Sequence, residues 1–217
     1  MAIRIALAGN PNCGKTTMFN ALTGANQYVG NWPGVTVEKK EGKLKSKKVK
    51  EEVVVTDLPG IYSLSPYTLE EVVSRDYLLK ENPDVIVDLV DATNIERNLY
   101  LTTQLIETGV PVVIALNMAD LLEKRGIKID VARLSMLLDC PIVETSALKG
   151  EGLDKLIDEA IKTAKKKEAD LPKEIFNKDL EDAVSAAAEV LPSSIDANKK
   201  RWYAVKFLEK DSKVAES

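Results

Sequence analysis

The sequence predicts an α/β protein with a doubly wound, mainly parallel sheet and one antiparallel edge strand. Short apolar runs alternate with helical patterns along residues 1–167, and several runs are apolar throughout, as in strands covered on both faces. Two runs are separated only by a short polar turn, which predicts an antiparallel hairpin. A sheet of this kind places its ligands at the carboxyl ends of its strands.

The N-terminal elements are a strand, a helix and the hairpin. Residues 3–8 are an apolar run, and residues 17–23 form a short helical pattern that Gly24 closes. Residues 25–36 are rich in Gly, Asn and Pro, which predicts a long mobile loop. The hairpin strands are expected at 37–44 and 50–56.

The elements that follow alternate strand with helix. A capping box, Thr68-Leu69-Glu70-Glu71, predicts a helix that runs to about residue 80. Further strands are expected at 85–90, 112–116 and 142–145, and further helices at 98–108, 130–138 and 153–167.

Two domains are expected, residues 1–167 and a helical extension at 168–217. The composition changes at 165–172, which indicates a linker, and helical patterns follow at 179–190 and 196–209. About 45 residues are too few for an independent core. The extension is therefore expected to dock on the α/β domain or to be the start of a larger helical domain.

The composition excludes several classes of function. The chain has 217 residues with 45% hydrophobic side chains and a net charge of −4, which argues against a general nucleic-acid binder. The absence of histidine excludes histidine-based catalysis and histidine metal ligation. The two cysteines, Cys13 and Cys140, lie far apart in the sequence, which indicates a protein of a reducing, cytosolic compartment. No secretory signal is expected. The apolar runs are far short of the roughly 20 residues of a membrane helix, so the chain as given is expected not to span a membrane.

The first motif is G-x-x-x-x-G-K-[ST] between the first strand and the first helix, the setting of a phosphate-binding loop. Its backbone N–H groups form an anion nest at a helix N-terminus. Lys15 adds a positive charge for the β- and γ-phosphates, and the Thr16 hydroxyl is a ligand for Mg²⁺. Cys13 is interpreted as a small loop residue without a redox role. The loop comprises Gly9, Asn10, Pro11, Asn12, Cys13, Gly14, Lys15 and Thr16, and Thr17 follows it.

Two further segments are expected to contact the γ-phosphate and Mg²⁺. Asp57 and Gly60 form D-x-x-G directly after a strand, roughly 40 residues after the phosphate loop. The carboxylate is suited to hold Mg²⁺ through water, and the Gly60 N–H to bind the γ-phosphate. Thr36 is placed to reach both, which would order its loop only while a nucleoside triphosphate is bound.

Base recognition is predicted at Asn117-Met118-Ala119-Asp120. An ionised aspartate accepts the neighbouring N1–H and N2–H₂ donors of guanine, whereas adenine would leave Asp120 unpaired. The backbone N–H groups of Ser146, Ala147 and Leu148, at the end of the next strand, are candidates for guanine O6. Alternatives are a strand-end turn with a capping aspartate, or an ATPase or kinase, which Asp120 disfavours. Met118 replaces the commoner lysine of this motif, which suggests weaker binding and faster exchange.

These motifs together resemble the small G-protein superfamily. The segments Gly30–Glu38, Asp57–Leu64 and Asp91–Leu101, with the tail from Leu191 to Trp202, resemble the ferrous iron transport protein B family (FeoB). The resemblance implies the cytosolic, N-terminal part of an inner-membrane Fe²⁺ transporter. It would be a G domain followed by part of a helical domain that favours GDP binding, with the transmembrane region after Ser217 and a possible homo-oligomer. No pattern in the sequence indicates an iron site.

The resemblance also implies a source of charge for hydrolysis. Ras-type GTPases orient water with a glutamine directly after D-x-x-G, but Ile61 occupies that position. The family implies K⁺ held by the side-chain amide of Asn12 and the backbone carbonyls of Gly30 and Trp32, and a hydrogen bond within the turn is the alternative role of Asn12. The predicted catalytic residues are Asn12, Lys15, Gly30, Trp32 and Thr36, and the Mg²⁺ ligands are Thr16, Thr36 and Asp57.

Three functions follow from these patterns. The first is a slow, Mg²⁺-dependent and K⁺-stimulated GTPase switch that regulates Fe²⁺ uptake. The second is a guanine-nucleotide sensor without hydrolysis, favoured by Ile61. The third is a soluble GTPase unrelated to transport.

Overall fold

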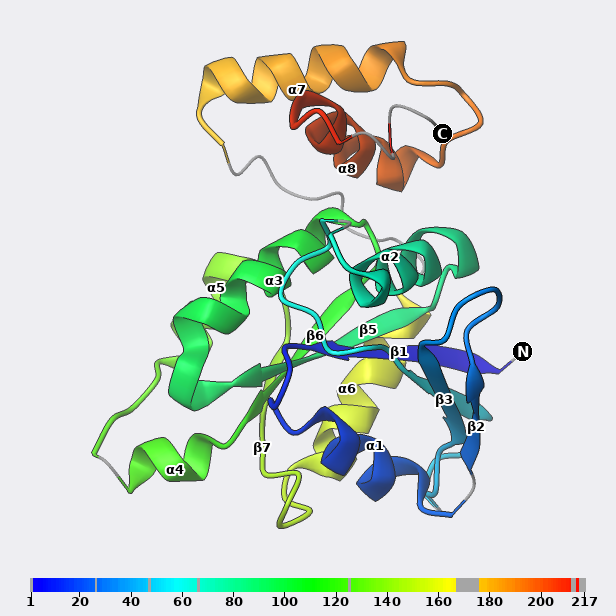
Figure 1. Cartoon of the computed structure of the whole chain (residues 1–217). Coiled ribbons are helices and arrows are strands. Elements are labelled where there is room, and N and C mark those ends of the chain that lie inside the picture. The colour runs from blue at the N-terminus through cyan, green and yellow to red at the C-terminus, as the bar shows by residue number, and fades with distance from the viewer. Residues whose placement is uncertain are drawn as a thin grey trace.

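A computed structural model describes residues 2–25, 27–46, 48–65, 67–124, 126–166, 176–211 and 214. Seven strands form one sheet in the order β2-β3-β4-β1-β5-β6-β7 (Figure 1). The pairs β4–β1, β1–β5, β5–β6 and β6–β7 are parallel, and β2–β3 and β3–β4 are antiparallel. The doubly wound, mainly parallel fold is confirmed. The strands are β1 (Ile3–Gly9), β2 (Gln27–Asn31), β3 (Glu38–Lys43), β4 (Val53–Asp57), β5 (Val85–Asp91), β6 (Val112–Asn117) and β7 (Ile142–Thr145).

The prediction of one long loop at 25–36 is wrong for β2. Residues 27–31 pair with β3, with Tyr28 opposite Glu41 and Gly30 opposite Lys39. Tyr28 and Val29 favour extended backbone, and pairing satisfies the polar groups of the backbone. Pro33 and Gly34 therefore lie in the tight turn from Trp32 to Val37, whereas Gly30 belongs to β2. The antiparallel edge has one strand more than expected.

The helices cover both faces of the sheet. Figure 1 shows α2, α3 and α5 on one face and α1 and α6 on the other. The capping box is present at the start of α2, where Thr68 Oγ1 accepts the Glu71 N–H and Glu71 Oε2 accepts the Thr68 N–H. The helices of this domain are α1 (Lys15–Thr23), α2 (Leu69–Asp76), a π-helical turn η1 (Tyr77–Glu81), a 3₁₀ turn η2 (Ala92–Asn94), α3 (Ile95–Glu107), α4 (Ala119–Glu123), α5 (Val131–Leu138) and α6 (Leu153–Lys165).

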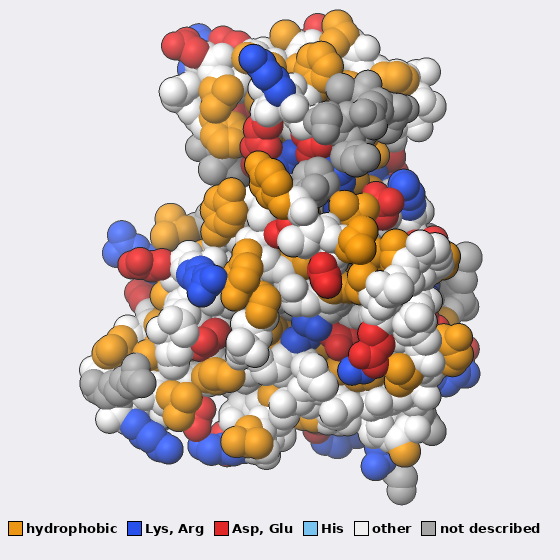
Figure 2. All heavy atoms as spheres, viewed as in Figure 1, with side chains coloured by type: hydrophobic (Ala, Val, Ile, Leu, Met, Phe, Trp, Pro, Cys, Tyr) orange, Lys and Arg blue, Asp and Glu red, His pale blue; other side chains and the backbone are white. Residues whose placement is uncertain are grey.

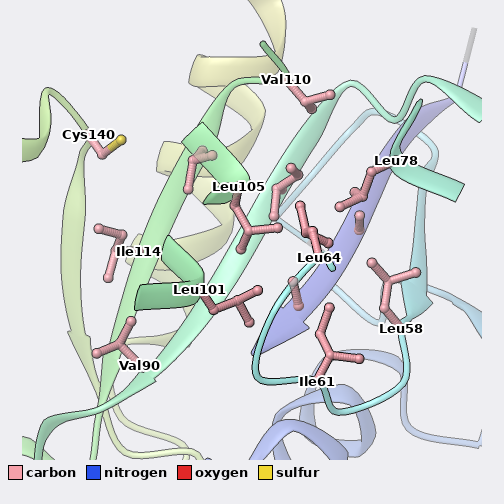
Figure 3. Close-up of a cluster of buried hydrophobic side chains, with 14 of the residues drawn as sticks. Leu58, Ile61, Leu64, Leu78, Val90, Leu101, Leu105, Val110, Ile114 and Cys140 are labelled. Atoms are coloured by element: carbon pink, nitrogen blue, oxygen red, sulfur yellow. The ribbon is translucent and has the colours of Figure 1, made fainter. Parts of the chain in front are cut away.

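Successive side chains of the buried strands point to opposite faces of the sheet, which divides the core into two clusters. In β1, Ala6 and Ala8 face the cluster under α2 and α3, and Ile5 and Leu7 face the cluster under α1 and α6. The first cluster includes Leu64, which lies near Leu101 of α3 in Figure 3. Apolar packing on both faces thus fixes the carboxyl ends of β1, β4, β5 and β6 along one edge.

The helical extension docks on the α/β domain through α8. It consists of α7 (Lys178–Val190) and α8 (Ala197–Leu208). Trp202 is fully buried and packs with Leu79 and Val214. Arg75 of α2 lies 2.8 Å from Asp211, with both side chains nearly buried. Docking, one of the two expected arrangements, is therefore present, whereas most of the predicted linker at 165–172 lies outside the described residues.

The surface shown in Figure 2 carries acidic and basic side chains interspersed rather than segregated by sign. Within the described ranges, the helices are all too short or too polar to cross a lipid bilayer.

Candidate functional site

The predicted phosphate loop connects β1 to α1 and passes close to two neighbouring strands. Gly9 has a φ of 149°, and a Cβ there would lie 2.7 Å from the Leu89 carbonyl oxygen. Gly14 has a φ of 93°, and a Cβ there would lie 2.6 Å from Asn117 Nδ2. Both positions therefore require glycine, because a side chain would push the loop away from β5 and β6.

The loop ends at the open N-terminus of α1. Gly14 is the N-cap residue and supplies no side-chain cap, and the first turn contains no acidic residue. The first turn carries Lys15, Thr16 and Thr17, and the two threonines are exposed. Free N–H groups, the helix dipole and a lysine at one point form a binding site for an anion such as a phosphate.

Lys15 and Asp57 form an ion pair at the centre of the site. Lys15 Nζ lies 2.5 Å from Asp57 Oδ1, and both side chains are at most 10% exposed. Burial raises the pKa of Asp57, and the adjacent Lys15 opposes this rise. The positive charge of Lys40 also lowers this pKa. A carboxylate oxygen is a ligand of the kind that Mg²⁺ prefers, so Asp57 and the exposed Thr16 hydroxyl fit the predicted Mg²⁺ role.

The D-x-x-G segment crosses the phosphate loop. The Ile61 N–H donates to the Gly9 carbonyl at 3.3 Å, and a Cβ on Gly60 would lie 3.2 Å from Pro11 Cα. The Ile61 side chain is buried in the core cluster near Leu64 (Figure 3). The position directly after D-x-x-G thus contributes to packing, and its side chain offers no polar group to a water molecule.

The turn from Trp32 to Val37, called here the first switch, lies at the same edge of the sheet, because Lys40 of β3 pairs with Asp57 of β4. Trp32 is buried in the core cluster, edge-on to Tyr77 at 5.3 Å between ring centroids. The backbone N–H of Trp32 donates to the Val37 carbonyl, and its carbonyl accepts the Val35 N–H. Thr36 is exposed.

The turn and the phosphate loop remain separate in this structure. Within the described residues, no hydrogen bond joins Gly30, Trp32 or Thr36 to the loop. Asn12 adopts a left-handed backbone with a φ of 66°, and its exposed side chain has no hydrogen-bond partner in the described part of the chain. The proposed turn hydrogen bond of Asn12 is therefore not observed, and its amide is available to a ligand.

The base-recognition motif is fixed by Asn117, which is buried at the end of β6. Its Nδ2 donates to the Cys13 carbonyl at 2.9 Å, and its Oδ1 accepts the Ala147 N–H at 3.0 Å. One amide thus holds together the phosphate loop and the loop after β7. Three N–H groups were expected to reach guanine O6. The Ala147 N–H donates to Asn117 and the Ser146 N–H donates to the Glu151 carbonyl, so the Leu148 N–H is the one that remains.

Asp120 lies in the first turn of α4, two residues after the left-handed Met118 at the N-cap of this helix. Asp120 Oδ2 lies 2.7 Å from Lys149 Nζ, and this contact lowers the pKa of Asp120. A cavity of about 390 Å³ opens beside Asp120 and Ser146, between α4 and the end of β7. Lys149 was not among the predicted residues, although its place directly after Ser146-Ala147-Leu148 is a signal that could have identified it.

The phosphate loop, the D-x-x-G crossing and the Asn117 bridge define a P-loop GTPase domain. The chain matches the family described as Ferrous iron transport protein B over residues 3–160, and the FeoB cytosolic helical domain over residues 176–217. It belongs to the FeoB family.

Relatives and solved structures similar to this chain are also FeoB proteins. The chain is 43% identical over 216 residues to the Fe(2+) transporter FeoB of Shigella flexneri, covering 96% of this chain and 27% of that transporter. An S. thermophilus NFeoB variant bound to mGDP is 53% identical, with a TM-score of 0.94 over 100% of this chain and 82% of that one. NFeoB from S. thermophilus bound to GDP, AlF4⁻ and K⁺ is 54% identical, with a TM-score of 0.87 over 99% and 82%. The chain thus spans about a quarter of the length of the full transporter.

Proposed function

We propose that this chain is a GTP-binding and slowly GTP-hydrolysing switch domain that regulates Fe²⁺ uptake by an inner-membrane transporter. The observation that carries the proposal is Asn117, which holds the phosphate loop and the loop after β7 around Asp120. A carboxylate in this position selects guanine, because its two acceptor oxygens match the paired donors of that base. The names of the FeoB relatives support the transport context.

The domain division extends this proposal. Residues 1–167 are assigned as the nucleotide-binding G domain and residues 168–217 as a helical extension that favours the GDP-bound state. The buried contacts that α8 and the following Asp211 make with α2 and η1 support this role, because they join the extension to the first elements that follow D-x-x-G in the chain. The membrane-spanning part of the transporter is proposed as the partner that responds to the nucleotide.

Different residues of the site are assigned to the phosphates, to Mg²⁺ and to K⁺. Lys15 and the α1 N-terminus hold the phosphates, and Thr16, Thr36 and Asp57 would hold Mg²⁺, which neutralises phosphate charge when bound. The Asn12 amide and the carbonyls of Gly30 and Trp32 would hold K⁺, which places a further positive charge beside the phosphates. Within the described residues no hydrogen bond joins the turn from Trp32 to Val37 to the phosphate loop, so we expect this turn to rearrange when it shares K⁺ with Asn12.

The buried Ile61 favours a second candidate, a guanine-nucleotide sensor that does not hydrolyse GTP. Phosphate release from GTP, measured in KCl and in NaCl, separates the two functions. The switch proposal expects slow release in NaCl and a clear increase in KCl, with no turnover of ATP. The absence of turnover in both salts would leave the sensor, and equal competition by ATP and GTP would contradict guanine selection.

A further inference from the structure

We propose that Lys149 competes with the guanine base for Asp120 and so sets nucleotide affinity and exchange. The inference rests on the proposed function, since it assumes that Asp120 accepts the guanine donors. Lys149 Nζ lies 2.7 Å from Asp120 Oδ2, so an ammonium N–H now occupies an oxygen that would accept from guanine. The Lys149 ammonium therefore takes the place of a guanine N–H donor at Asp120.

The position of Lys149 is set by a short turn. The Ser146 N–H donates to the Glu151 carbonyl, the Glu151 N–H donates to the Ser146 carbonyl, and the Lys149 N–H also donates to the Ser146 carbonyl. Gly150 and Gly152 have positive φ angles of 71° and 76°, which close the turn. The base of this turn is fixed through Ala147 and Asn117, whereas the Lys149 side chain extends toward α4.

The environment of the pair allows a ligand to displace the lysine readily. The Lys149 side chain is 45% exposed and that of Asp120 is 23% exposed, so water reaches both groups. Lys124 adds to the positive field at Asp120. An exposed pair of this kind contributes little to folding, and a base with two donors can replace the ammonium. The lysine nevertheless stabilises the nucleotide-free state and returns to Asp120 when the base leaves.

The competition predicts the direction of a mutational effect. Lys149→Met keeps most of the side-chain length but removes the ammonium, so Asp120 stays free for the base. The dissociation constant for GDP should fall about two- to fivefold, the factor expected from losing one exposed ion pair. Most of this change should appear as slower dissociation, because no lysine is present to replace the departing base.

Lys128→Met is the matched control. Lys128 is exposed and lines the cavity beside Asp120, but it forms no ion pair with Asp120 within the described residues. Losing this charge should leave the GDP dissociation constant unchanged. Thermal unfolding of both variants establishes that they fold alike.

A double-mutant cycle between Lys149 and Asp120 isolates the contribution of the Asp120 charge. The substitution Asp120→Asn replaces the carboxylate with an amide, whose one donor and one acceptor suit the C2 carbonyl and N1–H of xanthine. In that background Lys149→Met should give no gain for xanthosine diphosphate, because the neutral amide does not attract the ammonium. A gain there equal to the gain for GDP would overturn the competition.

The experiment is stopped-flow binding of fluorescent GDP to the full chain and its variants. Tighter binding by Lys149→Met than by the wild type and Lys128→Met supports the inference. Equal or weaker binding overturns it and indicates that Lys149 supports the base. Failure of the wild type to bind GDP at all would contradict the proposed function itself, which keeps the two failures distinct.

Discussion

At the residue scale, Asn12 is the side chain on which K⁺ stimulation depends. Its amide has no hydrogen-bond partner in the described chain, and the residue lies within the phosphate loop on a left-handed backbone. Asn12→Ala should therefore abolish the increase in phosphate release on changing NaCl to KCl. GTP affinity should change little, since Lys15 and the helix N-terminus remain. Stimulation that survives the substitution would show that the K⁺ site lies elsewhere.

Asp88 is a fully buried carboxyl in the middle of β5, next to the phosphate-loop strand β1. Burial raises its pKa to about 7, and the hydrogen bond from the Thr102 hydroxyl at 2.6 Å only partly offsets the effect. The unfolded chain loses this proton near pH 3.8, so the folded chain holds more protons between these values. Its free energy of unfolding should fall as the pH rises from about 4 to about 7.

Asp88→Asn should remove this part of the pH dependence. The amide oxygen can accept the Thr102 hydroxyl as the carboxyl oxygen does, and the amide carries no charge at any pH. Above pH 7 the variant should be more stable than the wild type by roughly 2–4 kcal/mol. Urea unfolding at pH 5 and pH 8 measures the difference, with Asp182→Asn on exposed α7 as the control for lost charge. A wild type that gains stability between these pH values relative to Asp88→Asn would contradict the assignment.

At the scale of elements, the first switch is anchored by one aromatic contact. Trp32 is buried against Tyr77 of η1, and the backbone of its turn is closed by hydrogen bonds to Val35 and Val37. We expect this turn to open when the Trp32 carbonyl and Asn12 share one cation, because no hydrogen bond joins the turn to the phosphate loop within the described residues. Since opening weakens the contact with Tyr77, the Trp32 ring should become more exposed to water.

Tryptophan fluorescence reports this change, because the chain contains only two tryptophans. In Trp202→Phe, emission from Trp32 should shift to longer wavelength when a non-hydrolysable GTP analogue binds in KCl. GDP should produce a smaller shift. The matched variant Trp32→Phe retains only Trp202, whose emission should stay constant. An unchanged spectrum in Trp202→Phe, with binding demonstrated separately, would mean that the turn does not open.

At the scale of the whole molecule, the strands and the phosphate motif were predictable because each depends on short-range pattern. An all-apolar run such as 112–116 has to be buried on both faces, and Gly9 to Thr16 carries its geometry in its glycines. The bridge made by Asn117 follows from the same logic, because strand ends in a parallel sheet meet along one edge.

The features that were missed depend on contacts between distant segments. β2 is stabilised by pairing with β3, which outweighs the local preference of its Gly and Asn residues for a loop. The pair between Lys149 and Asp120 joins the turn after β7 to the first turn of α4, and no spacing rule relates the two residues. The docking of α8 was one of two expected arrangements, and the sequence could not decide it because it depends on contact between Trp202 and Leu79, more than 100 positions apart in the chain.

The π-helical turn η1 links two of these distant contacts. Tyr77 packs against Trp32 of the first switch, and Leu79, two residues on, packs against Trp202 of α8. Just before η1, Arg75 of α2 forms its nearly buried pair with Asp211. A change in the docking of α8 therefore acts on the element that holds Trp32 in place.

Asp211→Ala tests whether this link favours GDP. The substitution leaves Arg75 buried without this partner, which should cost about 3 kcal/mol or more and raise hydrogen exchange in α8. Because η1 loses support, fluorescent GDP should dissociate several-fold faster. Lys80→Met, which breaks the exposed pair with Asp76, is the control and should change neither quantity. Faster exchange in α8 with an unaltered GDP dissociation rate would show that docking stabilises the extension without regulating the nucleotide.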